Sequence, residues 1–241
     1  MTRPARIAIA TYSVRPRGGA VHSLELAEAL AAEGVDVTLI ALGDPAEGFY
    51  RRTSVTTHII QAPPRAETLT ERVFSHIDAL TSGLAELGDR FDIVHTQDCI
   101  SARAAARIRE RGAGFCVFRT VHHIDDFTTP ALIECQDAAI TEPDRVLVVS
   151  DPWRRRLLDD YGVEAAVVTN GVRVERFAGA ARSGGERDAL RSRVSAGDRH
   201  LFLTVGGIEP RKGSRYLVEA LGLLKAAPGR PPMLAVVGGH S

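Results

Sequence analysis

Short apolar runs alternate with longer segments of helical spacing along almost all of the 241 residues. The short runs, rich in β-branched and aliphatic residues, predict strands. The segments between them carry apolar residues every three or four positions, which predicts helices. The first part of the chain is thus predicted to hold strands at residues 6–10, 35–42, 55–61, 91–96, 115–122, 145–150 and 163–169. Helices are predicted at residues 20–33, 67–87, 101–111 and 129–140, and from Asp151 onward.

This alternation predicts an α/β fold, with a Rossmann-like parallel sheet and helices on both of its faces. Ligands of such sheets bind at the carboxyl ends of the strands. Glycine and polar residues follow several of the predicted strands: Gly18-Gly19, His95–Asp98, His122–Asp126, Ser150-Asp151 and Asn170-Gly171. We therefore expect these segments to converge on one edge of the sheet.

The composition changes after the seventh predicted strand, which suggests a domain boundary. Residues 1–172 form the expected N-terminal Rossmann-like domain. Residues 173–198, rich in Ala, Gly, Arg and Ser, predict a linker with a short helix at 186–194. The alternation then resumes over residues 199–241, with strands at 200–207 and 232–239 around a helix at 213–226. These predict the start of a second, truncated Rossmann-like domain with an exposed apolar edge near Leu234–Val237.

Composition and charge narrow the class of protein. Lys plus Arg and Asp plus Glu number 30 each, so no excess charge points to a nucleic acid partner. The cysteines, Cys99, Cys116 and Cys135, are widely spaced, which favours a reduced cytoplasmic setting and argues against a metal site. No apolar run approaches the roughly 18 residues of a membrane span, and no signal segment precedes the first strand. Peripheral contact with a membrane stays open.

The glycine pair Gly18-Gly19 lies between the first predicted strand and helix. Backbone N–H groups at a helix start favour an anion, and two glycines let a phosphate approach the backbone. The segment matches neither G-x-G-x-x-G nor a Walker A loop. An ordinary strand-to-helix turn is the alternative interpretation.

Five segments, in the family's order, make the chain resemble the retaining GT-B glycosyltransferases of family 4. They share a place at the carboxyl end of a strand: Gly18-Gly19, Thr120–Asp126, Val149–Trp153, the hinge-like Val168–Phe177 and the donor-loop-like Val205–Gly213. The resemblance implies transfer of a sugar from a nucleotide-diphosphate donor to an acceptor hydroxyl, with retention of configuration. The acceptor is a small molecule or a lipid-linked glycan. The resemblance also implies no cofactor, no metal and no enzyme nucleophile.

On this resemblance, positive groups stabilise the leaving diphosphate. Arg211 and Lys212 fit that role, together with the amides of Gly18, Gly19, Gly206 and Gly207. In the family the arginine stands a few residues before the lysine, whereas here the two are adjacent. The sequence therefore leaves open which of Arg211 and Lys212 makes which contact with the diphosphate.

The same resemblance gives an active-site histidine, matched by His122 or His123. We favour His122, because neighbouring residues of a strand point to opposite faces. Asp125 or Asp126 is expected to bind acceptor hydroxyls or to orient the histidine. Substrate contacts are also assigned to two residues with simpler alternative roles: Asp98, which suits a helix cap, and Asn170, which suits a turn. His22 is interpreted as a helix-start residue, and His95 as a structural or pocket-edge residue.

In the family, an acidic E-x7-E element lies in the second domain, and residues 199–241 do not contain it. We expect the rest of the second domain on a longer native chain or on a partner subunit, and a poor catalyst without it. Two alternatives remain: a GT-B-like nucleotide-sugar epimerase, and a non-catalytic module that binds a nucleotide sugar or a partner.

Overall fold

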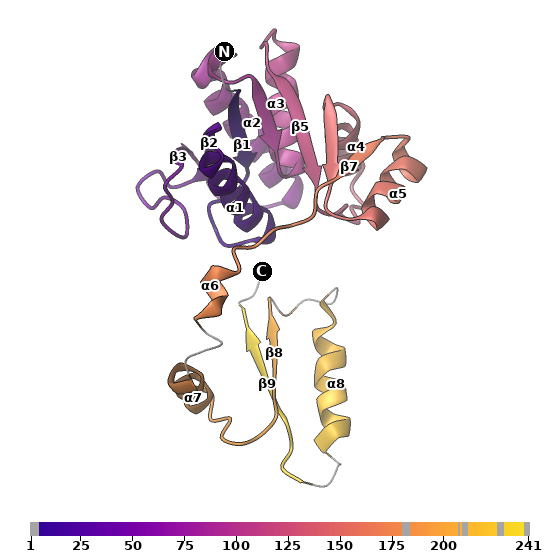
Figure 1. Ribbon diagram of the computed structural model, residues 1–241. Coiled ribbons are helices and arrows are strands. Elements are labelled where there is room, and N and C mark those ends of the chain that lie inside the picture. Colours follow the sequence, from indigo (N-terminus) through magenta and orange to yellow (C-terminus); the bar gives the residue numbers. More distant parts are fainter. Residues whose placement is uncertain (1–4, 180–183, 207, 209–211, 226–228, 239–241) are drawn as a thin grey trace. The chain divides into compact units, whose positions relative to one another are not determined.

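The computed structural model describes residues 5–179, 184–206, 208, 212–225 and 229–238 (Figure 1). Its contacts divide the chain into two units, Met1–Val172 and Arg173–Ser241. The predicted α/β architecture with a parallel sheet is confirmed in the first unit.

The first unit is built on a seven-stranded parallel sheet in the order β3-β2-β1-β4-β5-β6-β7. Its strands are β1 (Arg6–Thr11), β2 (Asp36–Gly43), β3 (Thr56–Gln61), β4 (Ile93–Thr96), β5 (Cys116–Val121), β6 (Arg145–Val148) and β7 (Ala165–Val167). The order reverses between β1 and β4, since the chain first builds outward on one side of β1 and then on the other. In open α/β sheets such a switch point is where ligands bind.

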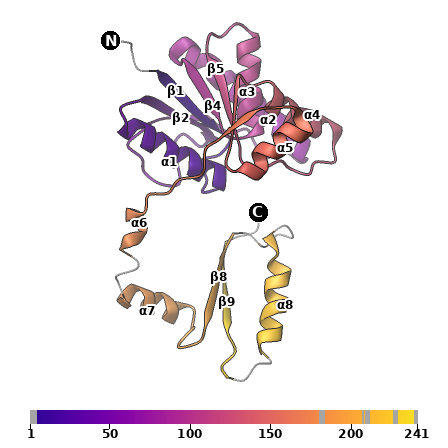
Figure 2. The same ribbon diagram turned by 45° about the vertical axis from the view of Figure 1, so that its right-hand side comes forward.

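Helices cover both faces of this sheet (Figure 2). They are α1 (Gly18–Ala32), α2 (Leu69–Leu87), α3 (Cys99–Glu110), α4 (Pro130–Thr141) and α5 (Asp151–Tyr161), with a 3-10 turn, η1, at Gly88–Arg90. Alternate residues of one strand serve the two faces. Ala8 and Ala10 of β1 thus pack in the core with α2 and α3, whereas Ile9 packs with α1.

The start of α1 differs from the prediction and from the starts of α2 and α3. The helix begins at Gly18 rather than Ala20, so the two glycines form its first turn instead of a turn before it. Within the described ranges no side chain caps α1, and its first turn holds no acidic residue. By contrast, α2 and α3 begin with capping boxes, led by Thr68 and Asp98. The first amides of α1 are therefore left to a partner from outside the helix.

The second unit contains a two-stranded parallel sheet of β8 (Leu201–Val205) and β9 (Met233–Val237). Its helices are α6 (Glu175–Ala178), α7 (Gly184–Arg193) and α8 (Ser214–Lys225). Helix α6 lies where the composition predicts only linker, so that detail was wrong. The exposed apolar edge is confirmed at Val236 and Val237, 40% and 56% exposed, whereas Leu234 is half-buried.

Candidate functional site

Three histidines gather at the carboxyl ends of β1, β4 and β5, on the side of the sheet that α1 covers. His22 lies in the second turn of α1, His95 in β4 and His122 directly after β5. The rings of His22 and His122 meet edge to face, with centroids 4.8 Å apart and planes inclined by 72°. Nε2 of His95 lies 2.7 Å from Oγ1 of Thr120. The interpretation of His22 as a helix-start residue is thus incomplete, because its ring also packs edge to face against the ring of His122.

The two adjacent histidines follow the end of β5 and differ in exposure and in partners. His122 is half-buried, and its Nε2 lies 3.0 Å from Oε1 of Gln97. His123 is exposed, and its Nε2 lies 3.3 Å from Oδ1 of Asp125. Asp126 is exposed as well. Of the four, only His122 lies against the ring of His22.

Burial keeps this histidine cluster uncharged. It lowers the pKa of His95 to about 4 and that of His122 to about 3. The nearby His22 and the buried Arg119 guanidinium oppose protonation of both rings further. Burial also lowers the pKa of His22, although a side-chain hydrogen bond with Asn170 partly offsets this effect. Near neutral pH the cluster therefore offers neutral imidazoles rather than imidazolium ions.

The Asp98 carboxylate joins two segments of the first unit through hydrogen bonds. One carboxylate oxygen accepts the Ser101 N–H at 2.8 Å and caps α3, and the other accepts the Tyr12 N–H at 2.8 Å. These bonds tie the start of α3 to the segment between β1 and α1. The capping role is observed, whereas a substrate contact by Asp98 stays a prediction.

The open start of α1 suits an anion. Among the residues that the structure describes in the first unit, and apart from the backbone of α1 itself, no atom lies within 4 Å of a Cβ added to Gly18 or Gly19. The uncapped N–H groups and the positive end of the helix dipole lie there. Ser23, whose Oγ donates to the Gly19 carbonyl at 2.7 Å, is buried behind this turn.

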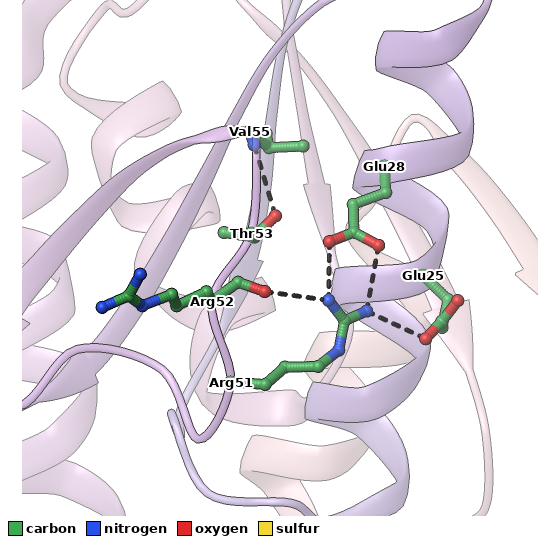
Figure 3. A network of polar contacts seen from close by, with 6 residues as sticks. All are labelled: Glu25, Glu28, Arg51, Arg52, Thr53 and Val55. Atoms are coloured by element: carbon green, nitrogen blue, oxygen red, sulfur yellow. Dashed lines mark hydrogen bonds and ion pairs between the residues drawn. The ribbon is translucent and has the colours of Figure 1, made fainter. Parts of the chain in front are cut away.

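An ion-pair network fixes the segment that follows β2 onto α1 (Figure 3). Arg51 donates from Nη1 and Nη2 to the two carboxylate oxygens of Glu28, at 2.6 and 3.0 Å, and from Nη2 to Glu25 at 2.9 Å. The neighbouring Tyr50 N–H donates to the Val14 carbonyl at 3.1 Å. The network thereby steadies the segment that leads into Gly18.

In the second unit, Gly206 follows β8 with a φ of +137°, a conformation that L side chains rarely adopt. The Lys212 side chain lies over it, since its Cδ would be 3.1 Å from a Cβ at that position. This contact joins two of the predicted donor-loop residues. The other two, Gly207 and Arg211, lie outside the described residues.

Sequence reasoning missed Gln97, Arg119 and Arg51. Gln97 and Arg119 are 2% and 5% exposed, and each has a buried side-chain nitrogen that no described residue meets with a hydrogen bond. For Gln97, the one available signal was a polar residue at the end of a predicted buried strand, and this signal does not identify a partner. Within the part of the chain that the structure describes, no group of three or more His, Cys, Asp or Glu residues is suited to hold a metal ion. A search of the same residues gives no helix with the length and apolar character of a membrane span.

The sequence model of Glycosyltransferase Family 4 matches residues 16–176. Two curated relatives are D-inositol 3-phosphate glycosyltransferases. The Kineococcus radiotolerans protein is 28% identical over 256 residues, with 92% of this chain and 56% of the relative covered. The Thermomonospora curvata protein is 27% identical over 251 residues, with 92% and 57% covered. The chain thus spans little more than half the length of these relatives.

Solved structures share the fold at low identity. HepE of Anabaena in complex with UDP-glucose superposes with a TM-score of 0.73 at 16% identity, covering 98% of this chain and 61% of that one. The catalytic domain of starch synthase IV from Arabidopsis thaliana, bound to ADP and acarbose, gives 0.72 at 14% identity, with 98% and 69% covered. WaaG, a glycosyltransferase involved in lipopolysaccharide biosynthesis, gives 0.69 at 16% identity, with 95% and 62% covered. The shared architecture is the GT-B fold.

Proposed function

The chain belongs to glycosyltransferase family 4, and on that basis we propose that it supplies the acceptor side and the diphosphate corner of a sugar transferase. The donor is a nucleotide-diphosphate sugar and the acceptor is a hydroxyl group. The anomeric carbon loses its bond to the diphosphate oxygen and gains one to the acceptor oxygen on the same face. The acceptor proton passes to the departing phosphate, so no enzyme base is required. The acceptor oxygen attacks on the face that the phosphate leaves, so no enzyme nucleophile is required either.

One observation carries this proposal: the uncapped glycine start of α1 lies beside the neutral His22–His122 pair, at the switch point of the sheet. The helix start favours the charge that develops on the leaving diphosphate. The uncharged ring of His122 suits contact with sugar hydroxyl groups. Lys212, with Arg211, adds positive charge for the diphosphate from the second unit. The proposal includes a metal-free reaction and a cytoplasmic protein, with peripheral membrane contact left open.

The test measures sugar transfer by the complete protein, isolated from its own cell, with a panel of nucleotide sugars. The acceptors include D-inositol 3-phosphate, after the curated relatives, and a lipid-linked glycan. Lys212→Ala should lower turnover by about 100-fold or more, as expected for the loss of one transition-state charge contact. Arg155→Ala, a charge change on the exposed side of α5, is the control and should leave turnover unchanged.

A loss under about threefold would remove Lys212 from the site, because a transition-state contact is worth far more. If no nucleotide sugar raises the melting temperature of the complete protein, the transferase proposal fails, and the module that binds a partner replaces it. Release of an epimerised sugar without an acceptor would favour the epimerase. Addition of EDTA should leave the transfer rate unchanged, and a loss of activity would contradict the metal-free reaction.

A further inference from the structure

Gln97 holds a fixed place beside His122. Its backbone N–H donates to the Ala10 carbonyl at 3.0 Å, which joins the end of β4 to β1. Its side chain is buried, and its Oε1 lies 3.0 Å from Nε2 of His122. An amide oxygen only accepts hydrogen bonds, so the ring nitrogen that faces it carries the proton.

We propose that Gln97 is a positioning residue that fixes His122 in the tautomer with the proton on Nε2. Nδ1 then keeps its lone pair and acts as an acceptor for a hydroxyl group. Among the described residues, none is recorded in a hydrogen bond with Nδ1 of His122. The use of Nδ1 for a substrate hydroxyl rests on the proposed function, whereas the tautomer does not.

The surroundings of the ring support this assignment. The edge-to-face contact with His22 restricts the ring from a second side. Burial is the main factor that opposes a positive charge on the ring, and the titratable or charged groups around it, His22, Arg119, His123 and His95, act in the same direction. The ring therefore stays neutral, and a neutral ring has one donor and one acceptor nitrogen.

A purely structural role does not account for a glutamine at this buried position. Its Nε2 is buried and has no hydrogen-bond partner among the residues that the structure describes. An unsatisfied buried donor is destabilising, and an apolar side chain of similar size would avoid that loss. The glutamine therefore suits a purpose that needs its oxygen, and the bond to His122 supplies one.

The experiment is ¹H–¹⁵N NMR of the imidazole nitrogens of the 241-residue chain at pH 7, which requires no enzyme activity. His122→Asn assigns the signals. We expect a protonated Nε2 and an unprotonated Nδ1 in the wild type. Gln97→Met should move the two ¹⁵N shifts toward each other as the tautomers mix, while the His95 signals stay in place. A proton on Nδ1 in the wild type, or unchanged shifts in Gln97→Met, would overturn the proposal.

Gln97→Glu keeps an acceptor at the same place and guards against a Met variant that folds poorly. It should retain the tautomer and raise the pKa of His122, because a carboxylate favours the imidazolium ion. An NMR pH titration measures this change, and an unmoved pKa would contradict the contact. If both variants behave as expected but the complete protein transfers no sugar, the positioning role stands and the proposed function fails.

Discussion

The two units follow the same strand–helix pattern in sequence but bury their apolar side chains very differently. In the first unit, Ile9 and Leu80 are fully buried between the sheet and its helices. In the second unit, Leu203 and Leu223 are 63% and 79% exposed. Among its described residues, Ala196 is the one buried apolar residue. Periodicity thus predicts an element, whereas burial depends on neighbours on both of its faces.

Truncating a leucine in each unit tests this contrast most strongly. Leu80→Ala should lower the free energy of unfolding by about 2–5 kcal/mol, since it leaves a cavity in the core. Leu223→Ala should change it by less than about 0.5 kcal/mol, as for an ordinary surface substitution. Urea unfolding followed by circular dichroism measures both. Similar losses would mean that Leu223 is covered in solution.

The ion pairs of the first unit should also contribute more to the free energy of unfolding than the ion pair of the second unit. The Glu25 and Glu28 side chains beside Arg51 are 10% and 11% exposed, so Arg51→Met should cost about 1.5–3 kcal/mol through lost charge-assisted hydrogen bonds. The Arg215–Glu219 pair is 85% and 52% exposed. Arg215→Met should therefore cost no more than about 0.5 kcal/mol. If the two substitutions change thermal unfolding equally, the Arg51 network is no more stabilising than the exposed pair.

Mild acid should destabilise the first unit through its histidines. The folded pKa values of His95 and His122, about 4 and about 3, lie below the ordinary value of 6.5. Below pH 6.5 the unfolded chain binds protons that the folded chain does not, so stability falls with pH until the folded pKa is reached. The loss between pH 6.5 and 5.5 is at most about 1.4 kcal/mol for each histidine.

Unfolding in urea at the two pH values checks this expectation, and carboxylates titrate mainly below this window. His95→Gln removes one titrating group and should shrink the difference. A difference that stays the same in this variant would assign the acid sensitivity to other groups.

The smallest expected effects on stability are those of substituting Gly18 and Gly206. Gly18→Ala lies in free space in a helical turn and should stabilise the chain by up to about 1 kcal/mol. Gly206→Ala should instead destabilise the second unit by about 1 kcal/mol or more, because Gly206 has a positive φ. Hydrogen exchange of amides in α1 and in β8 measures the two effects separately. A loss of protection in α1 would contradict the free space at Gly18.

Much of the fold could be predicted from local patterns. The short apolar run around Ile9 predicted the first strand, and Gly34, with a φ of +82°, follows α1 as predicted. The start of α1 was displaced because its glycines are weak helix formers, so propensity placed them outside. Helix α6 was missed because a single short turn leaves no periodic signal.

The site was less accessible to sequence reasoning. Strand alternation favoured His122 over His123, and only His122 meets the ring of His22. The bonds that hold the site join residues distant in sequence, such as Gln97 with His122 and Arg51 with Glu28. Nothing local to Gln97 or Arg51 specifies such a partner, because the pairing follows from the strand order.

That strand order also has a consequence for synthesis of the chain. β1 pairs with β2 on one side and with β4 on the other, and β4 begins at Ile93. A ribosome therefore releases β1, β2 and β3 long before the second neighbour of β1 exists. Until then the growing chain exposes one edge of β1 and carries His22 without His122. A chaperone that shields this edge during translation would protect the nascent protein when its sheet is only half assembled.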